Sequence, residues 1–260
     1  MWTIHNVLPH DSRFEPLEAH LCQELSNRAD LVHIMCDATR EEIGDLYGLP
    51  PGRTVTVAHS SYAGVYPDAA GRDLSRARFG FGSDDVVLLA LGGIRRYKGL
   101  DRFLEAFDRA STREPRLRLI VAGKTGIFEG LADLKEELEA HPRIIANFNE
   151  VLPTDLQYFY KAADVAVMPH QRVLNSGALL LAYTFGVPVI APRVGCLAEL
   201  LIEEAAIGFD ADSAESLEEA IVSAPSLANS GARRAAREIA DTRPIGEMSS
   251  RFLDALDGLF

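Results

Sequence analysis

Cysteine is scarce in this sequence, and the spacing of its three cysteines is unsuited to a disulfide framework. Cys22, Cys36 and Cys196 are far apart in a chain of 260 residues and form no CxxC pair. An odd number at wide spacing argues against a disulfide framework and against a zinc site. We therefore expect three core thiols, no metal site and a reducing compartment, the cytoplasm.

Positive charge is also in short supply. The chain has 26 lysines and arginines against 38 acids, which gives a formal net charge of -12. A protein whose main partner is nucleic acid or an anionic membrane needs a cationic face, so neither is expected as the main partner. The net charge does not exclude a local basic pocket for a small anion.

Long hydrophobic runs are missing as well. The most apolar stretch, residues 177–192, is too short for a membrane span and is interrupted by Gly186 and Pro188. The first residues, "MWTIHNVLPHD", have neither the basic region nor the apolar run of a signal peptide. We therefore expect the chain to be neither exported nor inserted into a membrane.

What the sequence does have is a regular alternation of short β-rich runs and amphipathic segments. Residues 100–107 and 131–138 repeat leucine and phenylalanine at helical spacing. Near-continuous apolar strands between such helices are typical of parallel sheets that are covered on both faces, so the predicted class is α/β and doubly wound. The predicted strands are residues 2–5, 31–35, 54–59, 86–91, 118–123, 144–148, 165–169 and 188–192.

The pattern divides the chain into four parts. Residues 86–240 form a complete α/β unit, and residues 63–85, rich in glycine and aspartate, are predicted to be an interdomain connection. Residues 1–62 hold only three strands, too few for a self-sufficient sheet, so they are predicted to be the tail of a domain whose front is absent. Such a sheet leaves an edge or face for a partner chain or a second copy to cover. Residues 241–260 are predicted to be an amphipathic helix, which could pack back on the N-terminal part.

The first candidate site is "LGGIRRYKGLD", residues 91–101. Gly92 and Gly93 end a predicted strand, and Arg95, Arg96 and Lys98 precede a predicted helix. The carboxyl end of a parallel strand is where open α/β sheets bind ligands, and a helix N-terminus adds partial positive charge. The spacing alone is equally compatible with a diphosphate site and with a solvated basic turn. Neither a Walker loop nor a GxGxxG fingerprint is present.

The second candidate site is "PHQRVLNSGALLLAYTFGVPVIAP", which begins at Pro169. Asn175 or Ser176 can cap a helix there, and the free amides of Ser176, Gly177 and Ala178 can then bind an anion, with Gly177 allowing close approach. Taken alone, this segment is better explained as an ordinary capped core helix.

Seven segments follow one another in a recognisable order: "ADLVHIMCDATREEI", "TVTVAHSSYAGVYP", "LLALGGIRRYKGLDRFLEAF", "RLRLIVAGK", "LQYFYKAADVAVMPH", "GVPVIAPRVGCLAELL" and "IGFDADSAESLEEAI". This succession, which covers essentially the whole chain, resembles the retaining nucleotide-sugar glycosyltransferases called group 1 or family four. The resemblance implies the two-domain GT-B fold, with residues 86–240 as the nucleotide-sugar-binding domain.

The resemblance also assigns roles to residues. Lys98 matches the lysine that contacts the donor diphosphate, while Gly93 occupies the usual arginine position, and Arg95 resembles the arginine of a branch that has "IRxYKG". His5 resembles a histidine that faces the active cleft, and Glu199 matches the glutamate of "GGxxE". Without the family, His5 is better explained as a structural histidine, and Glu199 equally well as an acid that favours a helix dipole.

Two departures from the family pattern concern the second site. Members carry two glutamates eight positions apart, which contact the donor sugar and the ribose. Val173 and Leu181 occupy those places here, and neither can hydrogen-bond a hydroxyl group. Asn175, Arg172 and Gln171 are the candidates to replace them.

The function implied is a hexosyltransferase of polysaccharide biosynthesis that needs no cofactor and no metal. It would move a sugar from a nucleoside diphosphate sugar to a glycan or lipid-linked acceptor, in the cytoplasm or in peripheral contact with the inner membrane face. Two GT-B domains need about 300 residues or more. The alternatives are therefore a degenerate nucleotide-sugar-binding module or half of a split enzyme and, as a remote one, a nucleotide-sugar 2-epimerase.

Overall fold

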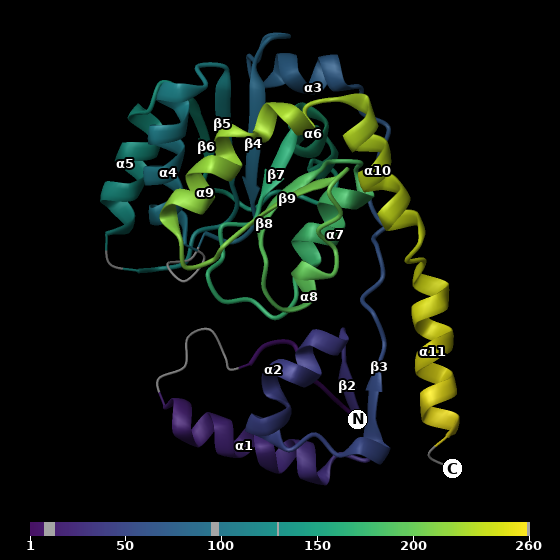
Figure 1. Cartoon of the computed structure of the whole chain (residues 1–260). Coiled ribbons are helices and arrows are strands. Elements are labelled where there is room, and N and C mark those ends of the chain that lie inside the picture. Colours follow the sequence, from purple (N-terminus) through teal and green to yellow (C-terminus); the bar gives the residue numbers. More distant parts are fainter. Residues whose placement is uncertain (8–13, 95–98, 129, 259–260) are drawn as a thin grey trace.

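The computed structural model describes residues 1–7, 14–94, 99–128 and 130–258. Figure 1 shows a larger lobe and a smaller one, joined by an extended segment. We call residues 71–94, 99–128 and 130–241 the C-terminal lobe and residues 1–7 and 14–57 the N-terminal lobe. Both lobes contain parallel sheets with helices, so the α/β prediction is confirmed.

The C-terminal lobe is built on one parallel sheet with the strand order β6-β5-β4-β7-β8-β9. Apolar side chains fill these strands, and Val87, Leu88 and Leu89 in β4 are all 0% exposed because both faces of the sheet are covered. Five of the strands lie where the apolar runs predict them, whereas β9 was not predicted. The strands are β4 (Val86–Leu91), β5 (Leu117–Ala122), β6 (Ile144–Asn147), β7 (Val165–Val167), β8 (Val189–Pro192) and β9 (Ala206–Phe209).

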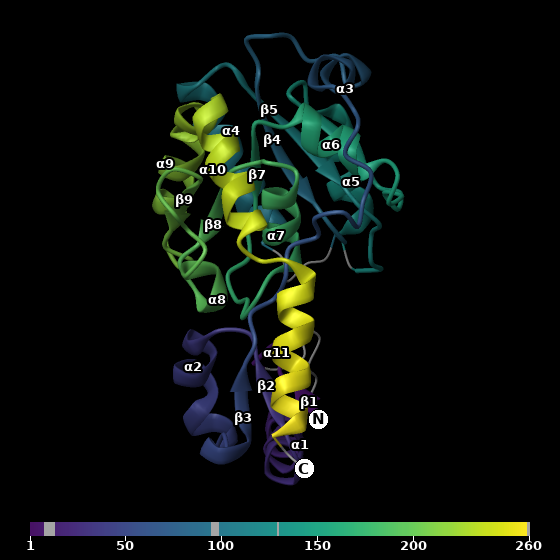
Figure 2. The same ribbon diagram turned by 90° about the vertical axis from the view of Figure 1, so that its right-hand side faces the viewer.

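Helices cover both faces of this sheet, as Figures 1 and 2 show. On one face of the sheet, Leu88 belongs to the same core as Phe107 of α4, and on the other face Leu89 belongs to the same core as Tyr183 of α7. Successive side chains of β4 therefore point into two separate cores. The first face carries α4 (Leu100–Arg113), α5 (Leu131–Ala140) and α9 (Ala214–Val222). The second carries α6 (Leu156–Ala162), α7 (Gly177–Thr184) and α10 (Ser230–Asp241). The short elements α3 (Arg72–Arg78), α8 (Gly195–Ala198) and η3 (Ala224–Leu227) complete the lobe.

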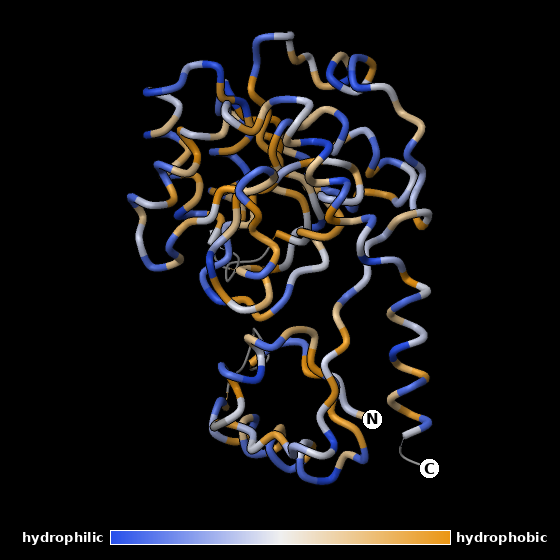
Figure 3. Tube along the Cα trace, turned by 45° about the vertical axis from the view of Figure 1, so that its right-hand side comes forward, coloured by the Kyte–Doolittle hydropathy of each residue, from blue (hydrophilic) through white to orange (hydrophobic). Residues whose placement is uncertain are grey.

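The N-terminal lobe has a sheet of three short parallel strands in the order β1-β2-β3. Its core joins Val32 and Ile34 of the central strand to Ile43 and Tyr47 of the helix that follows. In Figure 3, where the chain is coloured by hydropathy, the hydrophobic segments of the N-terminal lobe form a smaller group than those at the centre of the C-terminal lobe. The elements are β1 (Trp2–Thr3), α1 (Glu15–Arg28), β2 (Val32–Ile34), α2 (Asp37–Tyr47), η1 (Pro51–Arg53) and β3 (Thr54–Thr56).

The last helix, α11 (Ile245–Asp257), leaves the C-terminal lobe and runs alongside the N-terminal one. Its Phe252 ring lies 4.5 Å, centroid to centroid, from the ring of His33 in β2. His33 points to the face opposite Val32 and Ile34 because side chains alternate along a strand. In the part of the chain that the structure describes, no helix is both long and apolar enough to cross a membrane.

A disulfide joins the two lobes and corrects the prediction of three core thiols. Cys36, at the start of α2, is bonded to Cys196 in α8, while Cys22 is free. The partners are 160 residues apart in sequence, so their spacing could not reveal the pairing. The fold brings them together because each lies at the edge of its own lobe, facing the other.

Candidate functional site

A cavity of about 360 Å³ lies at the carboxyl ends of β4 and β7, between the lobes. Its described lining comes from the two candidate segments, from Val121 in β5, and from His5 and Asn6 of the N-terminal lobe. The first segment contributes residues 90–94 and 100, and the second contributes residues 167–170, 173 and 175–178. This is the edge at which parallel sheets bind ligands. The two candidate sites of the sequence therefore face the same space.

The first candidate site has a backbone that only glycine allows. Gly92 has φ 140°, and Gly123 in the neighbouring turn has φ 146°. A side chain on Gly123 would collide with the Gly92 carbonyl, which occupies the place of its Cβ. Gly92 and Gly93 both line the cavity. The predicted clamp residues, Arg95 and Lys98, lie outside the described residues, as does Arg96.

Gly99 fixes the first site against the second. It has φ 69° at the start of α4, and a Cβ there would lie 2.5 Å from the carbonyl oxygen of Pro169 at the end of the β7 segment. This contact packs the turn before α4 against the turn before α7. The N-termini of both helices consequently point towards one cavity, which Leu100 and Gly177 help to line.

At the second site, α7 begins as the sequence predicts. Ser176 is the N-cap, and its hydroxyl accepts a hydrogen bond from the Leu179 amide at 3.4 Å. Gly177 and Ala178 follow it along the cavity wall, where the first-turn amides of the helix carry partial positive charge.

A contact with Tyr62 explains why position 177 is a glycine, and the sequence did not reveal this contact. A Cβ there would lie 2.6 Å from the hydroxyl oxygen of Tyr62, in the connection between the lobes. The Tyr62 amide also donates to the Thr184 hydroxyl at the far end of α7, at 3.0 Å. Tyr62 thus lies along α7 and fixes the position of its N-terminus.

The N-terminal lobe reaches the cavity through His5 and Asn6. His5 is exposed and lines the cavity, while its backbone carbonyl accepts a hydrogen bond from the side-chain amide of Asn175. Asn175 is therefore engaged in holding the lobes together. Asn6 and His170 also line the cavity. Neither was singled out from the sequence, although His170 lies within the second candidate site.

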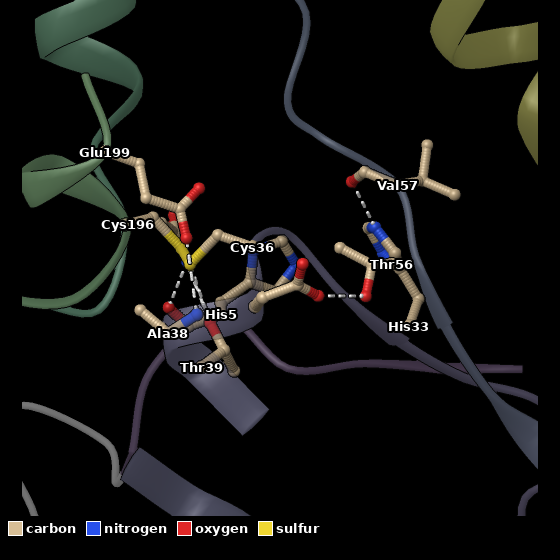
Figure 4. The surroundings of a disulfide bond; sticks show 11 residues. His5, His33, Cys36, Ala38, Thr39, Thr56, Val57, Cys196 and Glu199 are labelled. Atoms are coloured by element: carbon tan, nitrogen blue, oxygen red, sulfur yellow. Dashed lines mark hydrogen bonds between the residues drawn. A yellow bond between two sulfur atoms is a disulfide. The ribbon is translucent and has the colours of Figure 1, made fainter. Parts of the chain in front are cut away.

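Glu199 is not part of the lining of this cavity. Its carboxylate accepts a hydrogen bond at 3.3 Å from the Ala38 amide in the first turn of α2, as Figure 4 shows. A carboxylate at a helix N-terminus is favoured by the helix dipole. In this structure, Glu199 connects the lobes beside the disulfide, in a second cavity of about 20 Å³ that Ser176 and Cys36 also line.

The described polar side chains of this cavity belong to histidine, asparagine and serine. Val173 lines its wall, Leu181 packs against the core, and none of the described lining residues is an acid. Gln171 and Arg172, two candidates to replace the missing glutamates, are exposed and lie outside the lining. Among the described residues, no group of three or more histidine, cysteine, aspartate or glutamate side chains is placed to hold a metal ion.

Comparison with solved structures shows the same architecture. Anabaena HepE, solved in complex with UDP and glucose, is 17% identical with a TM-score of 0.81, over 98% of this chain and 70% of that one. A sucrose-phosphate synthase from Thermosynechococcus elongatus is 20% identical with a TM-score of 0.76, over 99% of this chain and 67% of that one. These similarities establish the GT-B fold.

Sequence comparison identifies the family. D-inositol 3-phosphate glycosyltransferase of Kineococcus radiotolerans is 31% identical over 193 residues, 71% of this chain and 44% of that protein. Its counterpart in Geodermatophilus obscurus is 30% identical over 247 residues, 87% of this chain and 53% of that protein. The chain spans about half the length of these curated relatives. The family model for glycosyl transferases group 1 matches residues 71–241, more than half of the chain, which therefore belongs to that family.

Proposed function

We propose that this chain is the donor-binding part of a retaining glycosyltransferase. It takes a sugar from a nucleoside diphosphate sugar and transfers it to a glycan or lipid-linked acceptor, without a metal. The observation that carries the proposal is the convergence of the N-termini of α4 and α7 on one interlobe cavity. Two helix N-termini suit the two phosphates of such a donor.

The chemistry assigned to the site is stabilisation of the leaving group. When the sugar–phosphate bond breaks, negative charge grows on the diphosphate. The first-turn amides of Gly177 and Ala178, two residues that line the cavity, are proposed to stabilise this charge. Arg95 and Lys98 are proposed to add full positive charges there. Hydrogen bonds from charged donors to phosphate are stronger than those from neutral ones, so these two residues are the proposed catalytic groups.

The comparisons guide the choice of ligands. HepE has been solved with UDP and with UDP-glucose, which favours a uridine nucleotide as the first donor to test. The curated relatives are named for D-inositol 3-phosphate, so a phosphorylated cyclitol belongs in the acceptor panel beside glycans and lipid-linked sugars.

A second candidate function is a non-catalytic nucleotide-sugar-binding module. The lining of the cavity favours it, because Val173 stands where the resemblance implies a glutamate and no described lining residue is an acid. Such a module would bind the nucleotide but would have no carboxylate there to hold the hydroxyl groups of the donor sugar.

Calorimetric titration of UDP, GDP and ADP into wild type and Lys98→Ala tests the nucleotide site. We expect at least one nucleotide to bind, and its affinity to fall about tenfold or more in Lys98→Ala because one charge-assisted phosphate contact is lost. Lys124→Ala is the matched control, since this exposed lysine follows β5 at the same end of the sheet but does not line the cavity.

The outcomes separate the candidates. If none of the three nucleotides binds wild type, both the transferase and the module are excluded. If one binds, incubation with the corresponding nucleotide sugar and the acceptor panel distinguishes them: a glycosylated product whose anomeric configuration by NMR matches the donor supports the transferase. Binding without transfer or donor hydrolysis supports the module.

A further inference from the structure

The disulfide lies where the lobes meet beside the proposed donor site. Cys36 is the N-cap residue of α2 in the N-terminal lobe, and Cys196 lies in α8 of the C-terminal lobe. Both are buried, with 4% and 7% of their surfaces exposed. The hydroxyl of Thr39 lies 3.2 Å from the sulfur of Cys36 and 3.3 Å from that of Cys196 (Figure 4).

One short chain of contacts connects this bond to the loop before α7. The Cys196 amide donates to the Leu174 carbonyl at 2.7 Å, and a Cβ on neighbouring Gly195 would lie 2.5 Å from the same oxygen. The start of α8 is therefore packed directly on the loop of residues 170–176. Any movement of Cys196 must move this loop with it.

The same loop is also anchored in the other lobe. Leu174 is 2% exposed and packs in the core of the N-terminal lobe with Ile4 and Ile34. Asn175 donates to the His5 carbonyl, also in the N-terminal lobe. The position of the loop, and of Ser176 at the start of α7, thus depends on how closely the lobes are held together.

We propose that Cys36 and Cys196 form a redox modification site, whose disulfide holds the lobes in the arrangement that binds the nucleotide. The inference rests on the proposed function for its ligand. When the bond is intact, the loop of residues 170–176 and the first-turn amides of α7 are preorganised for the diphosphate. When it is reduced, the lobes separate more readily and part of the binding free energy is spent on bringing them together.

The chemical step is thiol–disulfide exchange with a dithiol. A thiolate of the dithiol attacks the Cys196 sulfur, the sulfur–sulfur bond breaks, and its electron pair leaves on Cys36. The second thiol of the reagent then resolves the mixed disulfide and releases Cys196, so two thiols form here while the reagent becomes a disulfide.

The coupling between the disulfide and the nucleotide is reciprocal, because one thermodynamic cycle connects the two equilibria. A reductant reaches the bond only when the lobes part, and a bound nucleotide opposes that separation. By linkage, the factor by which oxidation tightens nucleotide binding equals the factor by which the nucleotide shifts the thiol–disulfide equilibrium towards the disulfide. A crosslink that merely stabilised the chain, with no connection to the site, would leave both factors at one.

The experiment measures both sides of this cycle on the full chain. UDP is titrated into the protein oxidised with glutathione disulfide and into the protein reduced with dithiothreitol. The fraction oxidised is then measured by thiol alkylation and mass spectrometry across glutathione redox buffers, with and without saturating UDP. We expect UDP to bind the oxidised form about tenfold more tightly, and saturating UDP to shift the redox equilibrium by the same factor.

Two variants serve as controls. Cys22→Ser removes the free thiol in α1 and should behave like wild type in both measurements. The double variant Cys36→Ser/Cys196→Ser should bind UDP with the affinity of reduced wild type, and this affinity should be the same in every redox buffer. Should the double variant fail to fold, wild type that has been reduced and alkylated replaces it.

Equal UDP affinities for the oxidised and reduced forms would overturn the proposal, as would complete alkylation of Cys36 and Cys196 after treatment with glutathione disulfide. If UDP binds neither form, the proposed function fails for this nucleotide, and hydrogen exchange then decides the redox inference separately. Exchange at residues 170–178 should be faster in the reduced protein. Identical exchange in the two forms would contradict the inference.

Discussion

Both lobes are parallel sheets packed against helices, but they differ in what stabilises them. The C-terminal lobe covers a six-stranded sheet on both faces and closes two large cores of its own. The N-terminal lobe has three strands of two or three residues, and one of the buried members of its core, Leu174, comes from the other lobe. Stability of the smaller lobe is therefore expected to depend on its attachments.

Among the described residues, three attachments stand out beside the interlobe hydrogen bonds of Glu199 and Asn175. The disulfide fixes the start of α2, the loop carrying Leu174 enters the core, and α11 places Phe252 against His33 on the opposite face of the sheet. A core this small buries little apolar surface, so the lobe is expected to gain much of its stability from these attachments. The comparison teaches that the interlobe contacts serve the proposed site and the smaller lobe at the same time.

The largest effect is expected from the ion cluster in the C-terminal lobe. Asp164 is 6% exposed; it pairs with Arg76 at 3.1 Å and with Arg72, and it accepts from the Val87 amide at 2.8 Å. Asp164→Asn leaves the guanidinium of Arg76 buried without its counter-charge, which costs about 3 to 5 kcal/mol of unfolding free energy. Urea denaturation followed by circular dichroism measures it.

Glu219→Gln provides the matched control for that charge change. Its partner Arg113 lies 2.6 Å away, but both side chains are largely exposed, so we expect a loss of less than about 1 kcal/mol. Similar losses for the two variants would show that burial does not set the value of the Asp164 cluster. They would remove one of the reasons for regarding the C-terminal lobe as self-sufficient.

The same cluster shows why part of the fold could not be predicted. The helix α3 has the mostly polar sequence "RDLSRAR" and lies within the segment predicted to be a connection. It is held by Asp164, whose partners Arg72 and Arg76 are 92 and 88 residues away in sequence. β9 was missed for a related reason: its Gly208 weakens the apolar run, and the side chain of Arg193 fills the space beside that glycine. Apolar runs predicted the other strands, of which β2, β4, β5, β7 and β8 are mostly or fully buried.

Part of the candidate site could also be predicted from the sequence, and part of it could not. The turns after β4 and before α7 were predictable, because chain order places the ends of parallel strands at one edge of the sheet. The contact between Gly99 and Pro169 that joins them depends on backbone conformation, and the lining by Asn6 depends on how the lobes dock. Glu199 was assigned to the donor side by resemblance alone, and its bond to the Ala38 amide could not be foreseen.

A smaller effect is expected from pH, and it should act on the N-terminal lobe. Burial lowers the pKa of His33, and the nearby His5 and His59 lower it further, while the Val57 carbonyl, which accepts from Nε2 at 2.8 Å, raises it in part. The unfolded chain therefore takes up the proton first, at a pH near 6.5. The contribution of His33 to stability is complete above that pH and is lost as the pH falls towards its lowered folded value.

Denaturation at pH 7.5 and pH 5.5 measures this contribution. His33→Gln keeps a donor for the Val57 carbonyl but cannot titrate, so the variant should lose less stability on acidification than wild type does. His20→Gln changes an exposed histidine of α1 and should retain the full acid sensitivity. If His33→Gln is as acid-sensitive as wild type, the contact beneath α11 does not control the smaller lobe in this pH range.

The smallest effect is expected on the outer face of α1, where the contrast between the lobes is sharpest. Leu17, Leu21 and Leu25 are 56%, 52% and 50% exposed, although they repeat at helical spacing. Leu21→Gln preserves helix propensity and loses little burial, so the unfolding free energy should change by less than about 0.5 kcal/mol. Ile43→Ala in the same lobe, at a residue 0% exposed, should cost about 2 to 5 kcal/mol. If Leu21→Gln proved as costly as Ile43→Ala, this face of α1 would have to be covered in solution, and the N-terminal lobe would have a further attachment.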